Sequence, residues 1–303
     1  MPVHLIGLRA IRAAHARALG SIVAAFPALE PAFIAVGRWI ARRSQTFGTL
    51  YWFAQDDLLR RLRASGRRFR PLPVAGLEMQ VDISDGTGRM HYFYDEPYEP
   101  DMALAIRRLL QAGDVFLDVG ANIGFFSVLA GCIVGETGRV VAFEPHPDAL
   151  ITLRAAIAVN GLSGIVEVVE AAVGNATGSV RFFLSGDPVL STLDPARSPA
   201  REHFTFDRSI EVRQLTLDGW LAERQHLAPR IRAIKIDVEG AEADVIDGMR
   251  RTLAACPRAA ILCETDAGSV ADRLLRADGY AASMLDVRQG GFGNYLYERT
   301  LTM

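Results

Sequence analysis

The stretch Val115–Ser127 reads VFLDVGANIGFFS, in which one apolar run ends at an aspartate and passes through glycines into a second apolar run. The first run has the β-branched and aromatic character of a buried strand, and the second is apolar enough to begin a helix. Gly120 and Gly124 allow a sharp turn and a close approach of the backbone to a ligand, and the first amides of the helix are unpaired donors. The stretch therefore predicts a strand, a tight turn and a helix that bind a nucleotide-like cofactor.

A second acid follows one strand later. Arg139–Glu144, RVVAFE, is another apolar run that ends in a carboxylate, and Glu144 in that place can accept hydrogen bonds from both hydroxyls of a ribose. Glycines also close ordinary β-α turns, so the glycine turn and Glu144 together indicate more than either alone. After the third strand comes AAVG, 171–174, where small residues such as Ala172 can admit an adenine ring.

The middle of the turn indicates which cofactor is bound. A dinucleotide fingerprint has G-x-G-x-x-G, with a middle glycine that makes room for the pyrophosphate, whereas this chain has Asn122 there. The asparagine disfavours a pyrophosphate and suits a cofactor with an amino-acid tail, whose ammonium can meet the Asp118 carboxylate and backbone carbonyls. S-adenosylmethionine fits this description.

The segment Ile234–Gly240, IKIDVEG, places charges where a central parallel strand should be apolar. Lys235 is the only lysine among 33 basic residues. Residues two apart share one face of a strand, so Lys235 and Asp237 project together, with Glu239 nearby. Burying these groups costs several kcal/mol unless they pair with each other or with a ligand, so a site and a purely structural ion pair are both open.

Acids recur where the predicted strands end. Open α/β sheets bind ligands at the carboxyl ends of their strands, and four acids fall there: Asp118, Glu144, Asp237 and Glu264. The sequence therefore predicts one site at this edge of the sheet.

Several motifs resemble the FkbM-type S-adenosylmethionine-dependent methyltransferase family: DVGANIGFFS, EPHP, Asn160 in AVNG, AAVGNATG and, most specifically, KIDVEGAE. The resemblance covers about residues 75 to 300. It implies an α/β, class I methyltransferase (Rossmann-like) fold, a seven-stranded mostly parallel sheet with an antiparallel last strand. It also implies an enzyme that methylates a hydroxyl oxygen of a sugar, glycoconjugate or natural product.

The resemblance assigns roles by matching position. The residues that it places at the methionine end of the cofactor are Asp118, Gly120, Asn122 and Gly124. It assigns Glu144 to the ribose of the cofactor. The residues that it places at the transfer site are Lys235, Asp237 and Glu239. A hydroxyl acceptor needs a base, and the sequence does not rank Asp237, Glu239 and a Lys235 whose pKa is lowered by burial.

The N-terminal part of the chain differs from the rest in its charge. Residues 1–70 carry twelve arginines against three acids, which predicts a basic helical N-terminal extension that ends near Pro71. Residues 71–303 are the expected methyltransferase domain, with a β-hairpin and a lead-in helix at 71–113 and the catalytic core at 114–303. The predicted hairpin pairs Leu77–Val81 with Met90–Tyr94, and the helix spans Asp101–Leu110.

Composition and segment patterns predict the compartment of the protein and the kind of partner that it binds. Three cysteines without metal-ligand spacing indicate a reducing compartment, so we expect a cytoplasmic protein. Prolines and charges interrupt the apolar segment between residues 22 and 40, which excludes a transmembrane helix there. The acceptor is expected to be a small molecule or glycan, and not a nucleic acid. Arginines 60–70 leave contact with an anionic surface open, and a homo-oligomer is also open.

Other interpretations are kept beside the methyltransferase. Asp237 and Glu264 could hold a divalent cation that orients the acceptor, although the sequence does not favour one. A NAD-dependent oxidoreductase could use a similar sheet, and a non-catalytic binding protein could dock through the arginine-rich extension. The loop 185–208 is a candidate substrate lid or a surface excursion, and Tyr98 and Glu99 either touch the active site or only pack.

Overall fold

The computed structural model describes residues 69–74, 76–82, 91–92, 98–185, 191–198, 206–286 and 292–299, with isolated positions between 28 and 39. These fall in two compact units, one made of Met1–Val74 and Met79–Pro97 and the other of Ala75–Glu78 and Tyr98–Met303. The helical extension predicted for residues 1–70 lies almost entirely outside the described residues.

A small two-stranded sheet precedes the main domain. It pairs β1 (Phe69–Val74) with β2 (Leu77–Asp82) through a turn in which Gly76 has φ 86°. The strand predicted at Leu77–Val81 is confirmed, but its predicted partner at Met90–Tyr94 is wrong, because His91 and Tyr92 are helical. Pro71, at which the predicted helical extension ends, lies in β1, and an edge strand tolerates proline because its N–H need not join a ladder.

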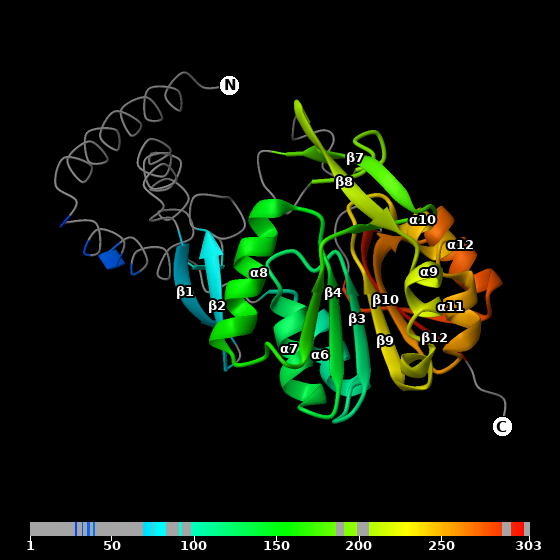
Figure 1. The fold of residues 1–303 in the computed structure, drawn as a ribbon, viewed down its shortest axis with the longest axis horizontal. Coiled ribbons are helices and arrows are strands. Elements are labelled where there is room, and N and C mark those ends of the chain that lie inside the picture. Colours follow the sequence, from blue (N-terminus) through cyan, green and yellow to red (C-terminus); the bar gives the residue numbers. More distant parts are fainter. Residues whose placement is uncertain are drawn as a thin grey trace, which may run out of the picture. The chain divides into compact units, whose positions relative to one another are not determined.

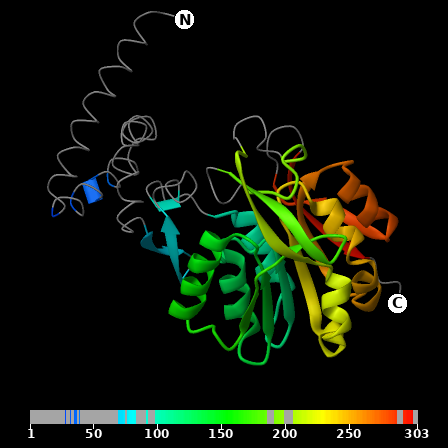
Figure 2. The same ribbon diagram turned by 45° about the horizontal axis from the view of Figure 1, so that its top comes forward.

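The main sheet has seven strands in the order β11-β12-β10-β9-β3-β4-β5 (Figures 1 and 2). Its parallel centre consists of β3 (Val115–Val119), β4 (Arg139–Phe143), β5 (Val166–Val169), β9 (Ile231–Ile236) and β10 (Ala260–Asp266). β12 (Phe292–Arg299) runs antiparallel to both β10 and β11 (Tyr280–Met284). The predicted mostly parallel seven-stranded sheet with an antiparallel last strand is confirmed.

Helices cover both faces of this sheet (Figures 1 and 2). One face carries α6 (Pro100–Leu109), α7 (Phe125–Val134) and α8 (Pro147–Val159), and the other carries α9 (Leu217–Ala222), α10 (Glu242–Asp247), α11 (Arg250–Ala255) and α12 (Val270–Ala277). β3 is buried at all five positions and is covered on both faces. The core therefore lies on the central strands, whose carboxyl ends carry the predicted site.

One predicted helix is divided in two. The pattern of residues 241–254 indicates a single helix, whereas the structure breaks it at Gly248 and Met249 between α10 and α11. A Cβ atom on Gly248 would lie 2.0 Å from the carbonyl oxygen of Gly174. The chain thus bends where its backbone packs against the segment that follows β6 (Ala172–Val173).

The chain forms a second sheet, of three strands, from segments that follow β5. It has the order β6-β8-β7, with β7 (Gly178–Leu184) antiparallel to β8 (Arg208–Leu215). Both long strands were predicted, at Ser179–Leu184 and Ile210–Leu217. The 3₁₀ helix η3 (Gln225–Arg230) connects α9 to β9. Within the part of the chain that the structure describes, no helix is both long and apolar enough to cross a membrane.

Candidate active site

The turn after β3 is held against the neighbouring strand ends by its backbone. Gly120 has φ 79°, and a Cβ atom there would lie 1.8 Å from the carbonyl oxygen of Asp237. The amides of Gly120 and Ala121 both donate to the carbonyl of Phe143, each at 3.0 Å. Only glycine permits this approach, so the glycine turn and the IKIDVEG segment, far apart in sequence, meet at one point.

Asn122 and Gly124 complete the turn and begin α7. Asn122 has φ 50° and Gly124 has φ 90°, both in the left-handed region that asparagine and glycine tolerate. The side-chain oxygen of Asn122 is buried and has no hydrogen-bond partner among the described residues. A buried acceptor without a donor is costly, so this oxygen is available to a bound donor such as an ammonium group.

Glu144 links the turn to the end of β4. Its Oε2 accepts a hydrogen bond from the amide of Asn122 at 2.8 Å, and its Oε1 accepts one from the amide of His146 at 2.7 Å. Burial raises the pKa of Glu144 to about 7, although these two amide donors oppose the shift. The carboxylate is therefore fixed in place, and its remaining lone pairs can receive hydroxyl donors.

A small cavity of about 40 Å³ adjoins Glu144. Its lining includes Gly120, Ala172, Leu193 and Val238, so the structure brings three of the predicted cofactor residues, Gly120, Glu144 and Ala172, to one cavity. Its apolar walls suit the flat ring of a nucleoside. In this structure the cavity is smaller than an adenosyl group.

Lys235 joins two of the predicted acids beneath the turn. Its Nζ lies 3.1 Å from Asp237 Oδ2 and 3.5 Å from Asp118 Oδ1, and it donates to the carbonyl of Gly120 at 3.2 Å. Burial alone would lower the pKa of Lys235, but the carboxylates of Asp237 and Asp118 outweigh it and raise the pKa above its ordinary value. The structure thus favours the protonated lysine, contrary to a lysine base with a lowered pKa.

Asp118 lies deeper than the sequence suggested. Its side chain is fully buried, and Ser127 Oγ donates to its Oδ2 at 2.6 Å. Burial raises the pKa of Asp118, while Lys235 and the Ser127 hydroxyl lower it. Asp118 therefore contacts Lys235 and Ser127 below the turn, and a contact with a cofactor ammonium stays a prediction.

Three carboxylates converge at the ends of β9 and β10. Ligand oxygens of Asp237, Glu239 and Glu264 all lie within 4.8 Å of one another. This cluster could hold a metal ion, and it includes Asp237 and Glu264, which the sequence left open as cation ligands without favouring a cation. Glu239 has φ 55°, and its carbonyl accepts a hydrogen bond from Thr192 Oγ1 at 2.7 Å.

Tyr98 and Glu99 approach this carboxylate cluster from the segment before α6. Burial, followed by the charges of Glu99 and Asp237, raises the pKa of Tyr98 well above its ordinary value. The Tyr98 ring also packs on Phe125, with 4.9 Å between ring centroids. Of the two interpretations that the sequence left open for this pair, the one that places them beside the active site is supported.

Asn294 is a polar residue of this site that was not predicted from the sequence. This residue is 1% exposed on β12 opposite Glu264, and its Nδ2 donates to Glu99 Oε2 at 3.2 Å. An amide inside an apolar terminal strand was the signal that could have found it, because a buried amide needs polar partners.

The segment 191–198 borders the small cavity beside Glu144. Leu193 lines that cavity, and Thr192 is fully buried, with backbone bonds to Phe183 in both directions. Arg197 pairs with Asp244 at 2.6 Å. These contacts show that residues 191–198 pack on the domain, and the role of the loop predicted at 185–208 as a substrate lid stays a prediction.

Comparison with known proteins decides the family. A family model described as the methyltransferase FkbM domain matches residues 118–280, more than half of the chain. The chain belongs to the FkbM methyltransferase family. The matched residues include the glycine turn, Glu144 and the IKIDVEG segment, on which the resemblance in the sequence rested.

Two curated methyltransferases are similar to about half of this chain, with identities of 25% and 28% over the aligned residues. The hexuronic acid methyltransferase AglP of Haloferax volcanii is 25% identical over 155 residues, 51% of this chain and 58% of AglP. The 2-O-methyltransferase NoeI of Sinorhizobium fredii is 28% identical over 179 residues, 54% of this chain and 71% of NoeI. The alignment thus leaves a large part of AglP unmatched.

Among solved structures, a precorrin-6y C5,15-methyltransferase from Geobacter metallireducens aligns with 66% of this chain and 87% of its own, at 19% identity and a TM-score of 0.40. M. jannaschii TYW2 in complex with AdoMet aligns with 77% of this chain and 87% of its own, at 10% identity and a TM-score of 0.42.

Proposed function

We propose that the protein transfers a methyl group from S-adenosylmethionine to a hydroxyl oxygen of a sugar, glycoconjugate or natural product. The observation that carries this proposal is the close approach of Gly120 to Asp237. It joins a turn suited to the cofactor with a buried lysine and a cluster of carboxylates. A family of methyltransferases supplies the reaction class.

The residues around the turn fit this cofactor. The buried Oδ1 of Asn122, which has no donor among the described residues, can accept a hydrogen bond from the ammonium of the methionine tail. Glu144 can accept hydrogen bonds from the ribose hydroxyls, and the small residues near Ala172 leave room for the adenine. When bound, S-adenosylmethionine supplies an electrophilic methyl group. The cavity would have to widen to admit the cofactor.

Methyl transfer requires the acceptor oxygen to be aligned and to lose its proton as the bond forms. We assign proton removal to Asp237 or Glu239. Asp237 keeps 20% of its side chain exposed and is held by the Lys235 ammonium at 3.1 Å. The lysine stays protonated, so its role is to fix Asp237 and to stabilise negative charge at the site.

The relatives support a hydroxyl acceptor. The name of AglP describes it as a hexuronic acid methyltransferase, and hexuronic acid is a sugar acceptor. The name of NoeI describes it as a 2-O-methyltransferase, which methylates an oxygen. The carboxylates of Asp237, Glu239 and Glu264 are suitable acceptors for the hydroxyls of a sugar. The same trio could bind a divalent cation, but Lys235 already supplies a positive charge beside it.

The proposal is tested by incubating the protein with methyl-¹³C-labelled S-adenosylmethionine and a panel of glycosylated acceptors. We expect a mass gain of one labelled methyl group, with the ¹³C chemical shift of a methyl ether. A labelled methyl on nitrogen or carbon would contradict the assignment to oxygen. Cofactor binding without transfer to any acceptor would favour a non-catalytic binding protein, and NAD binding in its place would favour an oxidoreductase.

A further inference from the structure

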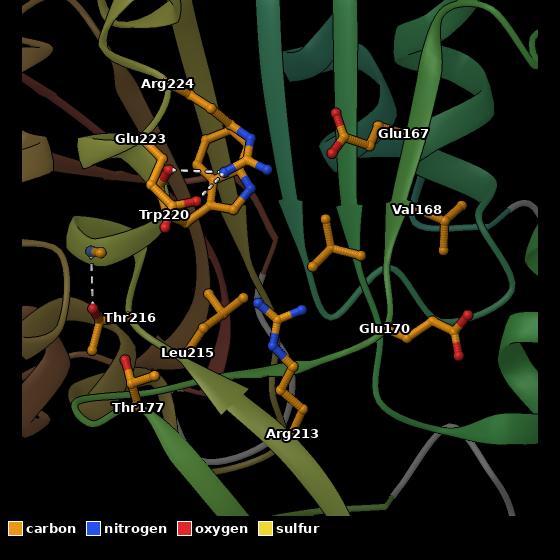
Figure 3. Close-up of a pocket in the computed structure, with 12 residues that line it drawn as sticks. Glu167, Val168, Glu170, Thr177, Arg213, Leu215, Thr216, Trp220, Glu223 and Arg224 are labelled. Atoms are coloured by element: carbon orange, nitrogen blue, oxygen red, sulfur yellow. Dashed lines mark hydrogen bonds and ion pairs between the residues drawn. The ribbon is translucent and has the colours of Figure 1, made fainter.

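A cavity of about 470 Å³ lies between β5, the three-stranded sheet and α9 (Figure 3). None of the residues that line it belongs to the candidate active site. The chain passes from β5 into the short strand β6 instead of into a helix, so no helix follows β5 to fill this space. The cavity therefore offers a separate place for a ligand.

The first feature that points to a ligand is Trp220. This side chain is 5% exposed, and its Nε1 is buried without a hydrogen-bond partner among the described residues. One edge of the ring system packs against Phe143, and the guanidinium of Arg224 lies over the indole, 5.0 Å from the ring centroid. Figure 3 shows the indole nitrogen turned toward the cavity. An indole N–H can only donate, so it needs an acceptor there.

The second feature is Arg213 on β8. Its guanidinium extends toward the same space as the Trp220 indole (Figure 3), and it makes no ion pair with any residue that the structure describes. The other charged groups that line the cavity are paired. Glu223 pairs with Arg224 at 3.2 Å, Glu167 with Arg139 at 2.6 Å, and Glu170 with Arg154. Arg213 is thus an uncompensated positive charge beside an unpaired N–H donor.

The third feature is Glu167, across the cavity from Trp220. Nε and Nη2 of Arg139 both donate hydrogen bonds to Glu167 Oε2, so Glu167 Oε1 can accept a hydrogen bond from a ligand. Figure 3 shows the Glu167 carboxylate directed toward Trp220, while that of Glu170 points away. One end of the cavity therefore offers donors for an anion, and the other offers an acceptor for a hydroxyl.

We propose that this cavity binds a small hydroxylated anion, with one phosphate or carboxylate group on a polyol. The Arg213 guanidinium and the Trp220 indole N–H hold the anionic group, and Glu167 accepts a hydrogen bond from a hydroxyl. A guanidinium pairs with phosphate or carboxylate through two parallel bonds, and the indole N–H adds a third donor.

The experiment follows the indole N–H directly. The chain has three tryptophans, Trp39, Trp52 and Trp220, so ¹⁵N-indole labelling gives three cross-peaks. These are assigned with Trp220→Phe and, in case that variant does not fold, by exclusion with Trp39→Phe and Trp52→Phe. Titration with glucose 6-phosphate is expected to shift the Trp220 cross-peak saturably at millimolar ligand. Neutral glucose is expected to leave it in place.

The matched variants are Arg213→Ala and Arg181→Ala, since Arg181 lies on β7 of the same sheet and does not line the cavity. We expect Arg213→Ala to weaken binding at least tenfold and Arg181→Ala to preserve it, and raised salt to weaken binding in the wild type. A Trp220 cross-peak that does not move, that moves equally with glucose, or that moves equally in Arg213→Ala would overturn the proposal.

Discussion

Gly120 and Asp237 approach each other so closely that a single methyl group on the glycine would lie 1.8 Å from the aspartate carbonyl oxygen. The two residues directly follow strands β3 and β9, which are adjacent and parallel. Each lies in one of the two polar segments that stood out in the sequence. Their contact explains why the cofactor turn and the charged strand end form one site.

Gly120→Ala is expected to destabilise the fold by about 3 kcal/mol or more, because the new Cβ must displace backbone. Gly268→Ala is the matched control, since Gly268 has a similar φ of 77° but nothing within 4 Å of a Cβ. That variant should cost only about 1 kcal/mol, from backbone strain. Urea unfolding measures both, and equal losses would show that the contact with Asp237 does not constrain position 120.

Lys235→Met removes the ammonium between two carboxylates in a buried site. Loss of one partner of a buried ion pair costs roughly 3 to 5 kcal/mol, and we expect a loss of that size in the free energy of unfolding. The double variant Lys235→Met/Asp118→Asn should recover part of the lost free energy of unfolding, because it removes one of the two carboxylates that are left without the lysine. Arg139→Met breaks an exposed pair with Glu167 and should cost less than about 1 kcal/mol. Similar losses in both single variants would contradict the buried network.

The stability of the protein should depend on the ionisation of Glu144. Burial raises its pKa from 4.5 to about 7, so between these pH values the folded protein binds more protons than the unfolded chain. Stability should therefore fall as pH rises through this window, by up to about 3 kcal/mol. Unfolding by urea at several pH values, compared with Glu144→Gln, isolates this contribution. A pH dependence that is unchanged in Glu144→Gln would assign it to other groups.

Removal of divalent cations should not change the rate of methyl transfer. Lys235 already places a positive charge 3.1 Å from Asp237, which lowers the need for a metal beside the three carboxylates. The initial rate is measured with and without EDTA. A loss of rate that magnesium restores would instead assign Asp237, Glu239 and Glu264 as metal ligands.

Much of this site was predictable because its signals are local. A strand that ends in Asp118 before a glycine turn, and the only lysine of the chain two residues before Asp237, are visible in the sequence. The rule that ligands bind at the carboxyl ends of parallel strands then brings them together. In the structure Gly120, Glu144 and Ala172 line one cavity, and their contact with a cofactor stays a prediction.

What the sequence did not predict depends on long-range contacts. Asn294 reaches Glu99 across nearly two hundred residues, and no local pattern records that distance. The division of α10 from α11 follows from the packing of Gly248 on Gly174. The pKa of Lys235 is raised by Asp237 and by Asp118. Asp118 lies on β3, so the spacing of residues in β9 does not predict how close it is to the lysine.

Binding of S-adenosylhomocysteine, measured by calorimetry, shows whether the glycine turn and Glu144 form an S-adenosylmethionine site. We expect the wild type to bind at micromolar ligand and Glu144→Ala to lose at least about tenfold in affinity, because that variant removes charged hydrogen bonds to the ribose. Glu136→Ala, an exposed acid at the end of α7, should bind as the wild type does. No binding at micromolar ligand, or unchanged affinity in Glu144→Ala, would contradict the account.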